Sequence, residues 1–130
     1  MMLYLDNAAT TLKKPLSVYA TLFKSTLFSG GNAGRGGHKM SMDAVRAIVD
    51  TQDLIAQLFN IKKAENIVFT QNATYALNTA ILGTMSNGGH IVVTEMDHNS
   101  VLRPACLPDN YTVVKADKSG YVHAEDIEKA

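Results

Sequence analysis

The chain has 130 residues, a length that suits one domain with a buried core, and its 46% hydrophobic and 18% charged content is typical of globular proteins. Twelve basic residues balance twelve acidic ones, so the composition gives no reason to expect binding to nucleic acid or to membranes. The sequence shows neither a signal-peptide pattern nor an apolar run of membrane length, and Cys106 has no second cysteine to pair with. We therefore expect a cytoplasmic protein.

Residues 1–40 are expected to form an N-terminal arm, a helix and a glycine-rich loop. The apolar arm ends in a polar cluster at residues 6–11, and Pro15 suits the first turn of a helix that reaches about residue 28. Residues 30–37 are too rich in glycine for a stable helix or strand, so they predict a mobile or ligand-shaped loop.

Residues 41–130 are expected to form an incomplete α/β domain. Ser41 can cap a helix whose apolar residues recur at helical spacing as far as Phe59. Beyond it, short apolar runs predict strands at residues 67–70, 91–95 and 112–116. A helical stretch at residues 74–85 separates the first two strands. This alternation indicates a mainly parallel sheet flanked by helices, with functional sites at the carboxyl ends of the strands.

The carboxyl end predicts truncation. Acidic residues within residues 123–130 announce a helix that stops after about two turns. A parallel sheet also needs further strands, so we expect the chain to end inside a domain.

A phosphate cradle is predicted at Asn72, Ala73 and Thr74, where a strand turns directly into a helix. The first amides of a helix lack intrahelical partners and lie at the positive end of its dipole, so they favour an anion. The glycine signatures of dinucleotide and nucleoside triphosphate sites are absent here, which favours a smaller phosphorylated cofactor. The alternative is an ordinary strand-to-helix junction with a polar cap.

Two further groups of residues have types that suit chemistry but no supporting pattern. His90, Asp97 and His98 could hold a metal by residue type, yet no recognised ligand spacing connects them, so we expect no metal site. Cys106 has no neighbouring His or Lys in sequence to activate it as a nucleophile, which favours a packed or idle thiol.

Four stretches, in order along the chain, resemble the class V aminotransferases, and most of all the amino-terminal portion of the cysteine desulfurase and selenocysteine lyase branch. They are Tyr-Leu-Asp-Asn-Ala-Ala-Thr-Thr at residues 4–11, Gly-Arg-Gly-Gly-His at 34–38 followed by Ser41, Ile-Val-Phe-Thr-Gln-Asn-Ala-Thr-Tyr-Ala-Leu-Asn at 67–78, and Glu-Met-Asp-His-Asn-Ser-Val-Leu-Arg-Pro at 95–104.

The resemblance implies part of the large domain of a fold type I enzyme that uses pyridoxal 5'-phosphate and works as a homodimer on a small amino acid such as cysteine. In the family the cofactor phosphate is held at the turn that matches Ala73 and Thr74, in agreement with the anion argument. His98 matches the family histidine that stacks on the cofactor ring and assists proton transfer, and a near-neutral imidazole suits both tasks. The alternative for His98 is a histidine that caps the end of a strand.

The resemblance also implies residues for the substrate. Asn7 and Ala8 match a family segment near the substrate carboxylate, although an Asx-type turn there is equally compatible with the sequence. Arg35 and His38 match a loop that approaches the active site across the dimer interface, where an arginine can pair with a carboxylate or phosphate. A solvated loop charge is the alternative for Arg35.

The family lysine that anchors the cofactor, the carboxylate at its ring nitrogen and the desulfurase cysteine all belong beyond residue 130. We therefore expect this chain to be inactive alone, and the sequence leaves desulfurase, transaminase and selenocysteine lyase chemistry open. Other interpretations are a naturally short binding or assembly module, one half of a split enzyme, or an unrelated domain that binds a small phosphorylated ligand.

Overall fold

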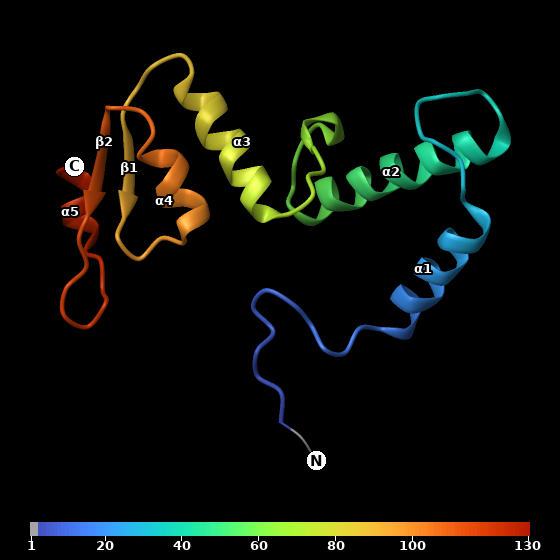
Figure 1. The fold of residues 1–130 in the computed structure, drawn as a ribbon, viewed down its shortest axis with the longest axis horizontal. Coiled ribbons are helices and arrows are strands. Elements are labelled where there is room, and N and C mark those ends of the chain that lie inside the picture. The colour runs from blue at the N-terminus through green and yellow to red at the C-terminus, as the bar shows by residue number, and fades with distance from the viewer. Residues whose placement is uncertain (1–2) are drawn as a thin grey trace. The chain divides into compact units, whose positions relative to one another are not determined.

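The computed structural model describes residues 3–130, and the chain forms two compact units that divide after Ile67 (Figure 1). The sequence-based division after residue 40 falls inside helix α2, Lys39–Leu58. Within residues 3–130, none of the helices combines the length and the hydropathy that crossing a bilayer requires.

The first unit is helical. Helix α1, Leu16–Phe28, begins directly after Pro15, as the sequence predicts, and none of its residues is buried. Helix α2 buries Ser41 and Ala56, and the short 3-10 helix Ala64–Asn66 follows it. The Gln52 side chain donates a hydrogen bond of 2.7 Å to the Ile67 carbonyl, so α2 holds the segment that leaves this unit.

The start of α2 corrects the prediction that Ser41 caps the helix. His38 is the cap, and its Nδ1 accepts a hydrogen bond of 3.4 Å from the Ser41 amide. The buried Ser41 hydroxyl instead donates to the Asn32 carbonyl at 2.7 Å, which ties the glycine-rich loop to the helix. Gly31 permits this approach, because a Cβ at that position would overlap the backbone of Met40.

The second unit carries a small parallel sheet. Strands β1 (Ile91–Thr94) and β2 (Tyr111–Val114) pair in parallel, in register from Ile91↔Tyr111 to Thr94↔Val114. The elements follow one another as α3 (Ala73–Met85), β1 (Ile91–Thr94), α4 (Asn99–Ala105), β2 (Tyr111–Val114) and α5 (Ala124–Glu128). Helix α4 packs against both β1 and α3, and it forms the crossover that a parallel pair requires (Figure 1). Val93 of β1, Ala105 of α4 and Val114 of β2 are buried apolar residues of this unit.

Two features of this unit differ from the sequence-based expectation. The strand expected at residues 67–70 was wrong: the segment forms no strand, and Val68 is 78% exposed. A strand needs a neighbour for its backbone hydrogen bonds, and the sheet in the described chain contains only β1 and β2. The sequence patterns also predicted no helix between residues 95 and 112, where α4 forms despite Pro104.

Candidate functional site

The turn that opens α3 is fixed by Asn72. Its backbone is extended, and its side-chain Oδ1 accepts a hydrogen bond of 3.0 Å from the Tyr75 amide, which makes it the N-cap. Its carbonyl accepts from the Ala76 amide at 3.2 Å and from the Thr70 hydroxyl at 2.9 Å. The side-chain oxygen of Asn72 is therefore engaged by its own helix, and direct binding of the cofactor by Asn72 stays a prediction.

The Ala73 and Thr74 amides are left free by this arrangement. Both residues are exposed, and their amides donate to no acceptor within residues 3–130. They are the first two amides of a 13-residue helix, so they carry the positive end of its dipole. The geometry of the turn thus suits a phosphate, which supplies several acceptor oxygens and negative charge.

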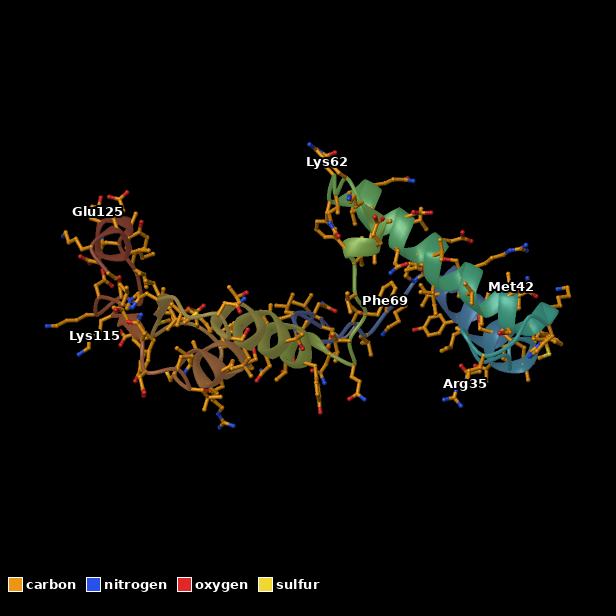
Figure 2. All side chains as sticks on the ribbon, turned by 90° about the horizontal axis from the view of Figure 1, so that it is seen from above. Arg35, Met42, Lys62, Phe69, Lys115 and Glu125 are labelled. Carbon is orange, nitrogen blue, oxygen red and sulfur yellow. The ribbon has the colours of Figure 1, made fainter. Side chains whose placement is uncertain are left out.

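An open pocket of about 510 Å³ is lined by residues that precede and follow the cradle in sequence. They are Phe69, Thr70, Gln71, Tyr75 and Thr79, which come from the segment before α3 and the first two turns of that helix. The Phe69 side chain projects from this segment in Figure 2. A pocket with two aromatic side chains, Phe69 and Tyr75, suits a flat ligand.

His98 follows β1 and caps helix α4. Its Nδ1 accepts a hydrogen bond of 3.1 Å from the Ser100 amide and lies 2.9 Å from the Ser100 hydroxyl. Because an amide can only donate, Nδ1 is the unprotonated nitrogen, and the neutral ring carries its proton on Nε2. His98 is exposed, and its Nε2 has no partner in the part of the chain that the structure describes. The ring is therefore hydrogen-bonded at Nδ1, and Nε2 is available to a ligand.

The turn before His98 is held by Asp97. Its Oδ2 accepts hydrogen bonds from the Thr94 amide at 2.8 Å and from the Thr94 hydroxyl at 3.1 Å. The neighbouring Glu95 joins the ends of the two strands, because its amide donates to the Val114 carbonyl and its carboxylate accepts from the Ala116 amide at 2.7 Å. His98 therefore follows a turn at the carboxyl end of β1 that is fixed by hydrogen bonds from Thr94 and Ala116.

Asn78 connects the two helices of the site. Its Nδ2 donates to the Thr74 carbonyl at 2.9 Å and to the Ser100 carbonyl at 3.3 Å. The first turn of α3 and the first turn of α4 therefore lie within hydrogen-bonding reach of one nitrogen atom. Sequence reasoning missed Asn78, Ser100 and Asp97 as supporting residues.

The expected substrate residues Asn7 and Ala8 belong to the first unit. They lie with residues 9–11 and Lys14 around an open pocket of about 340 Å³. Asn7 makes a local turn, in which its amide donates to the Leu5 carbonyl at 3.2 Å. Their contact with a substrate stays a prediction.

Arg35 and His38 also belong to the first unit. Arg35 is exposed, and its side chain projects away from the loop in Figure 2, while its amide donates to the Asn32 carbonyl at 3.3 Å. His38 caps α2, as described above. The structure brings Asn72, Ala73, Thr74 and His98 into the second unit, and the substrate roles of Arg35 and His38 stay predictions.

The candidate metal ligands are engaged in separate contacts. His90 lies 2.8 Å from Asn110 Oδ1 and 2.9 Å from Thr112 Oγ1, Asp97 bonds Thr94, and His98 caps α4. Among residues 3–130, no three His, Cys, Asp or Glu side chains gather closely enough to hold a metal ion.

Shifted pKa values occur outside the cradle. Hydrogen bonds from the Ser119 hydroxyl, the Tyr121 amide and the Ser119 amide lower the pKa of Asp117 from 3.8 to about 2. A hydrogen bond from the Lys39 ammonium lowers the pKa of Asp43. Both carboxylates stabilise turns or helix ends of their own unit.

The family model of aminotransferase class-V matches residues 3–130. The chain belongs to the class V aminotransferase family. Two relatives in this family are named probable cysteine desulfurases: that of Aeropyrum pernix is 39% identical over 78% of this chain, and that of Borreliella burgdorferi is 28% identical over 98% of it. The apo structure of a cysteine desulfurase from Thermococcus onnurineus superposes with a TM-score of 0.76 at 28% identity, over 95% of this chain.

This class V aminotransferase chain spans a quarter to a third of those proteins: 25% of the Aeropyrum relative, 32% of the Borreliella relative and 32% of the Thermococcus chain. The likeness confirms the resemblance seen in the sequence. It also confirms the expected fold class, an α/β segment of the large domain of a fold type I enzyme with parallel strands and flanking helices.

Proposed function

We propose that this chain is the cofactor-binding amino-terminal portion of a cysteine desulfurase-like enzyme that uses pyridoxal 5'-phosphate. The observation that carries the proposal is the pair of free amides at Ala73 and Thr74, on a helix that is bonded through Asn78 to the helix capped by His98. The relatives named above carry the names cysteine desulfurase or probable cysteine desulfurase, which supports cysteine as the substrate of the whole protein.

The cradle residues fit the phosphate of this cofactor. The amides of Ala73 and Thr74 and the Thr74 hydroxyl would hold phosphate oxygens, and Asn72 would keep the turn open toward them. The Phe69 and Tyr75 rings, which line the pocket described above, suit an aromatic ligand. When bound, the cofactor supplies an electron sink for bond cleavage at the substrate amino acid.

His98 would serve as the proton-carrying group. In the neutral ring Nδ1 accepts from the Ser100 amide and Nε2 carries the proton, so Nε2 would donate a hydrogen bond toward the ligand. Nε2 would accept a proton only in the other tautomer, in which Nδ1 no longer accepts from Ser100. The flat imidazole would also cover one face of the cofactor ring.

Asn7 and Ala8 would lie near the substrate carboxylate. Arg35 and His38 would approach the active site across the interface of a cytoplasmic homodimer, where Arg35 would pair with a carboxylate or phosphate.

The test uses Ala73→Pro in the full chain. Proline is favoured at the first helical position, and Asn72 before it is already extended, so this change removes one cradle amide while the helix persists. Since a hydrogen bond to a charged group contributes about 1.5–3 kcal/mol, the affinity for pyridoxal 5'-phosphate should fall roughly tenfold or more. The measurement is a titration followed by amide chemical shifts.

Ala73→Ser is the matched control, because it keeps the amide, and its affinity should match that of the unchanged chain. Pyridoxal without the phosphate should leave the Ala73 and Thr74 amides unshifted. Equal binding of both compounds, or unchanged affinity in Ala73→Pro, would contradict the cradle.

The same sample tests whether the chain binds the cofactor covalently. Lys115, directly after β2, is exposed and does not lie in the family's cofactor-lysine context, so no retained visible band should survive removal of excess cofactor. A band that one lysine substitution abolishes would overturn this expectation. Co-purification with a second polypeptide that restores the band would identify one half of a split enzyme.

A further inference from the structure

Pro104 leaves one carbonyl of α4 without its helical partner. In a regular helix the carbonyl of residue 100 accepts from the amide of residue 104, but proline has no amide hydrogen, and its ring crowds that same carbonyl. Ser100 and Pro104 are both buried, so water is a poor substitute. A buried carbonyl without a donor costs free energy.

Asn78 of α3 supplies the missing donor. Its Nδ2 lies 3.3 Å from the Ser100 carbonyl and 2.9 Å from the Thr74 carbonyl, and the side chain is half-buried between the helices. The Asn78 side-chain nitrogen therefore joins Thr74, a residue of the cradle, to Ser100, which accepts at its carbonyl and holds the His98 ring. The Ser100 amide and hydroxyl complete the path to His98 Nδ1.

We propose that Asn78 is a positioning residue, which uses the carbonyl freed by Pro104 to fix the distance between His98 and the phosphate cradle. The need for a fixed distance between His98 and the cradle rests on the proposed function, in which one ligand contacts both. A ligand whose phosphate lies on Ala73 and Thr74 and whose ring lies against His98 requires that spacing, whereas inorganic phosphate does not.

The test is a double-mutant cycle with Asn78→Leu and Pro104→Ala in the full chain. Asn78→Leu keeps similar volume and removes the donor, so the ring resonances of His98 should shift, while those of His38, His90 and His123 should stay. Pro104→Ala restores an amide to the Ser100 carbonyl, so in that background Asn78→Leu should shift His98 much less. Thr84→Val is the control, because the Thr84 hydroxyl bonds only the Ala80 carbonyl of its own helix, at 2.7 Å.

Ligand affinity gives a second readout. Asn78→Leu should weaken pyridoxal 5'-phosphate by roughly three- to tenfold, the value of one neutral hydrogen bond, and leave the affinity for inorganic phosphate within about twofold. Unshifted His98 resonances in Asn78→Leu, or an equal shift with and without Pro104, would overturn the proposal.

Two further outcomes also test the role of Asn78. If Asn78→Leu alone fails to fold, recovery of the fold and of the His98 resonances in the double variant supports the proposal, and failure of the double variant overturns it. Absence of any cofactor response in the unchanged chain would refute the proposed function, while the ligand-free His98 shifts would still test the role of Asn78.

Discussion

The two units of this chain hold their elements together by different means. In the first unit α1 buries none of its 13 residues, and α2 buries only Ser41 and Ala56, so its described helices depend mainly on their own backbone hydrogen bonds. Side-chain bonds from Ser41 and Gln52 tie the flanking segments to α2 without a buried apolar cluster among the described residues of this unit. In the second unit buried residues of β1, α4 and β2 pack together, and side chains bond across elements. The cradle and His98 lie in the unit whose geometry is fixed by contacts between elements.

The largest expected effect is a charge in the buried centre of the second unit. Val93 is 5% exposed, and Val93→Asp places an unpaired carboxylate there, which should cost about 3 kcal/mol or more. Leu22 in α1 is 65% exposed, so Leu22→Asp should change stability by only about 0.5 kcal/mol. Hydrogen exchange, amide by amide, should show lost protection in β1, β2 and α4. Equal loss of protection in α2 would contradict the contrast between the units.

A smaller effect is expected at the amino ends of the strands. The His90 ring joins Asn110 and Thr112 through its two nitrogens, at 2.8 and 2.9 Å. His90→Ala should destabilise β2 by about 1 kcal/mol, because the bonds are exposed. Thr112→Val removes one of the two bonds and keeps the shape, so it should have about half that effect in denaturant unfolding. No change in either variant would show that packing alone holds the strand pair.

The smallest effect concerns the turn after β2 and depends on pH. The folded-state pKa of Asp117 is about 2, below its usual 3.8, so its contribution is complete above about pH 4 and is lost as the pH falls toward about 2. The Ser119 and Tyr121 amides should then lose their protection from exchange. Asp117→Asn keeps an acceptor that does not titrate, so its turn should show no such pH dependence. The same pH dependence in both chains would assign the effect to other groups.

Sequence patterns predicted what depends on local chemistry. Helices α1 and α3, the strands near residues 91 and 112 and the polar cap at Asn72 follow from apolar spacing and capping residues. The predicted strand at residues 67–70 failed, because a strand also needs a neighbour to bond.

Those patterns could not predict contacts between residues that are distant in sequence. Asn78 and Ser100 are 22 positions apart, and no periodicity connects them. The signal that existed was Pro104, which removes the helical donor of Ser100 and so requires another one. His98 was identified as a site residue by family resemblance, whereas its role as a helix cap became visible only in the structure.

The central claim is that the start of α3 and the His98 ring bind one ligand together. The most direct measurement is the set of intermolecular nuclear Overhauser effects between pyridoxal 5'-phosphate and the chain labelled with carbon-13 and nitrogen-15. We expect contacts from the pyridine ring protons to the His98 ring, with shifted Ala73 and Thr74 amides in the same complex. A complex in which those amides shift and the pyridine ring contacts other residues, with none to His98, would contradict it.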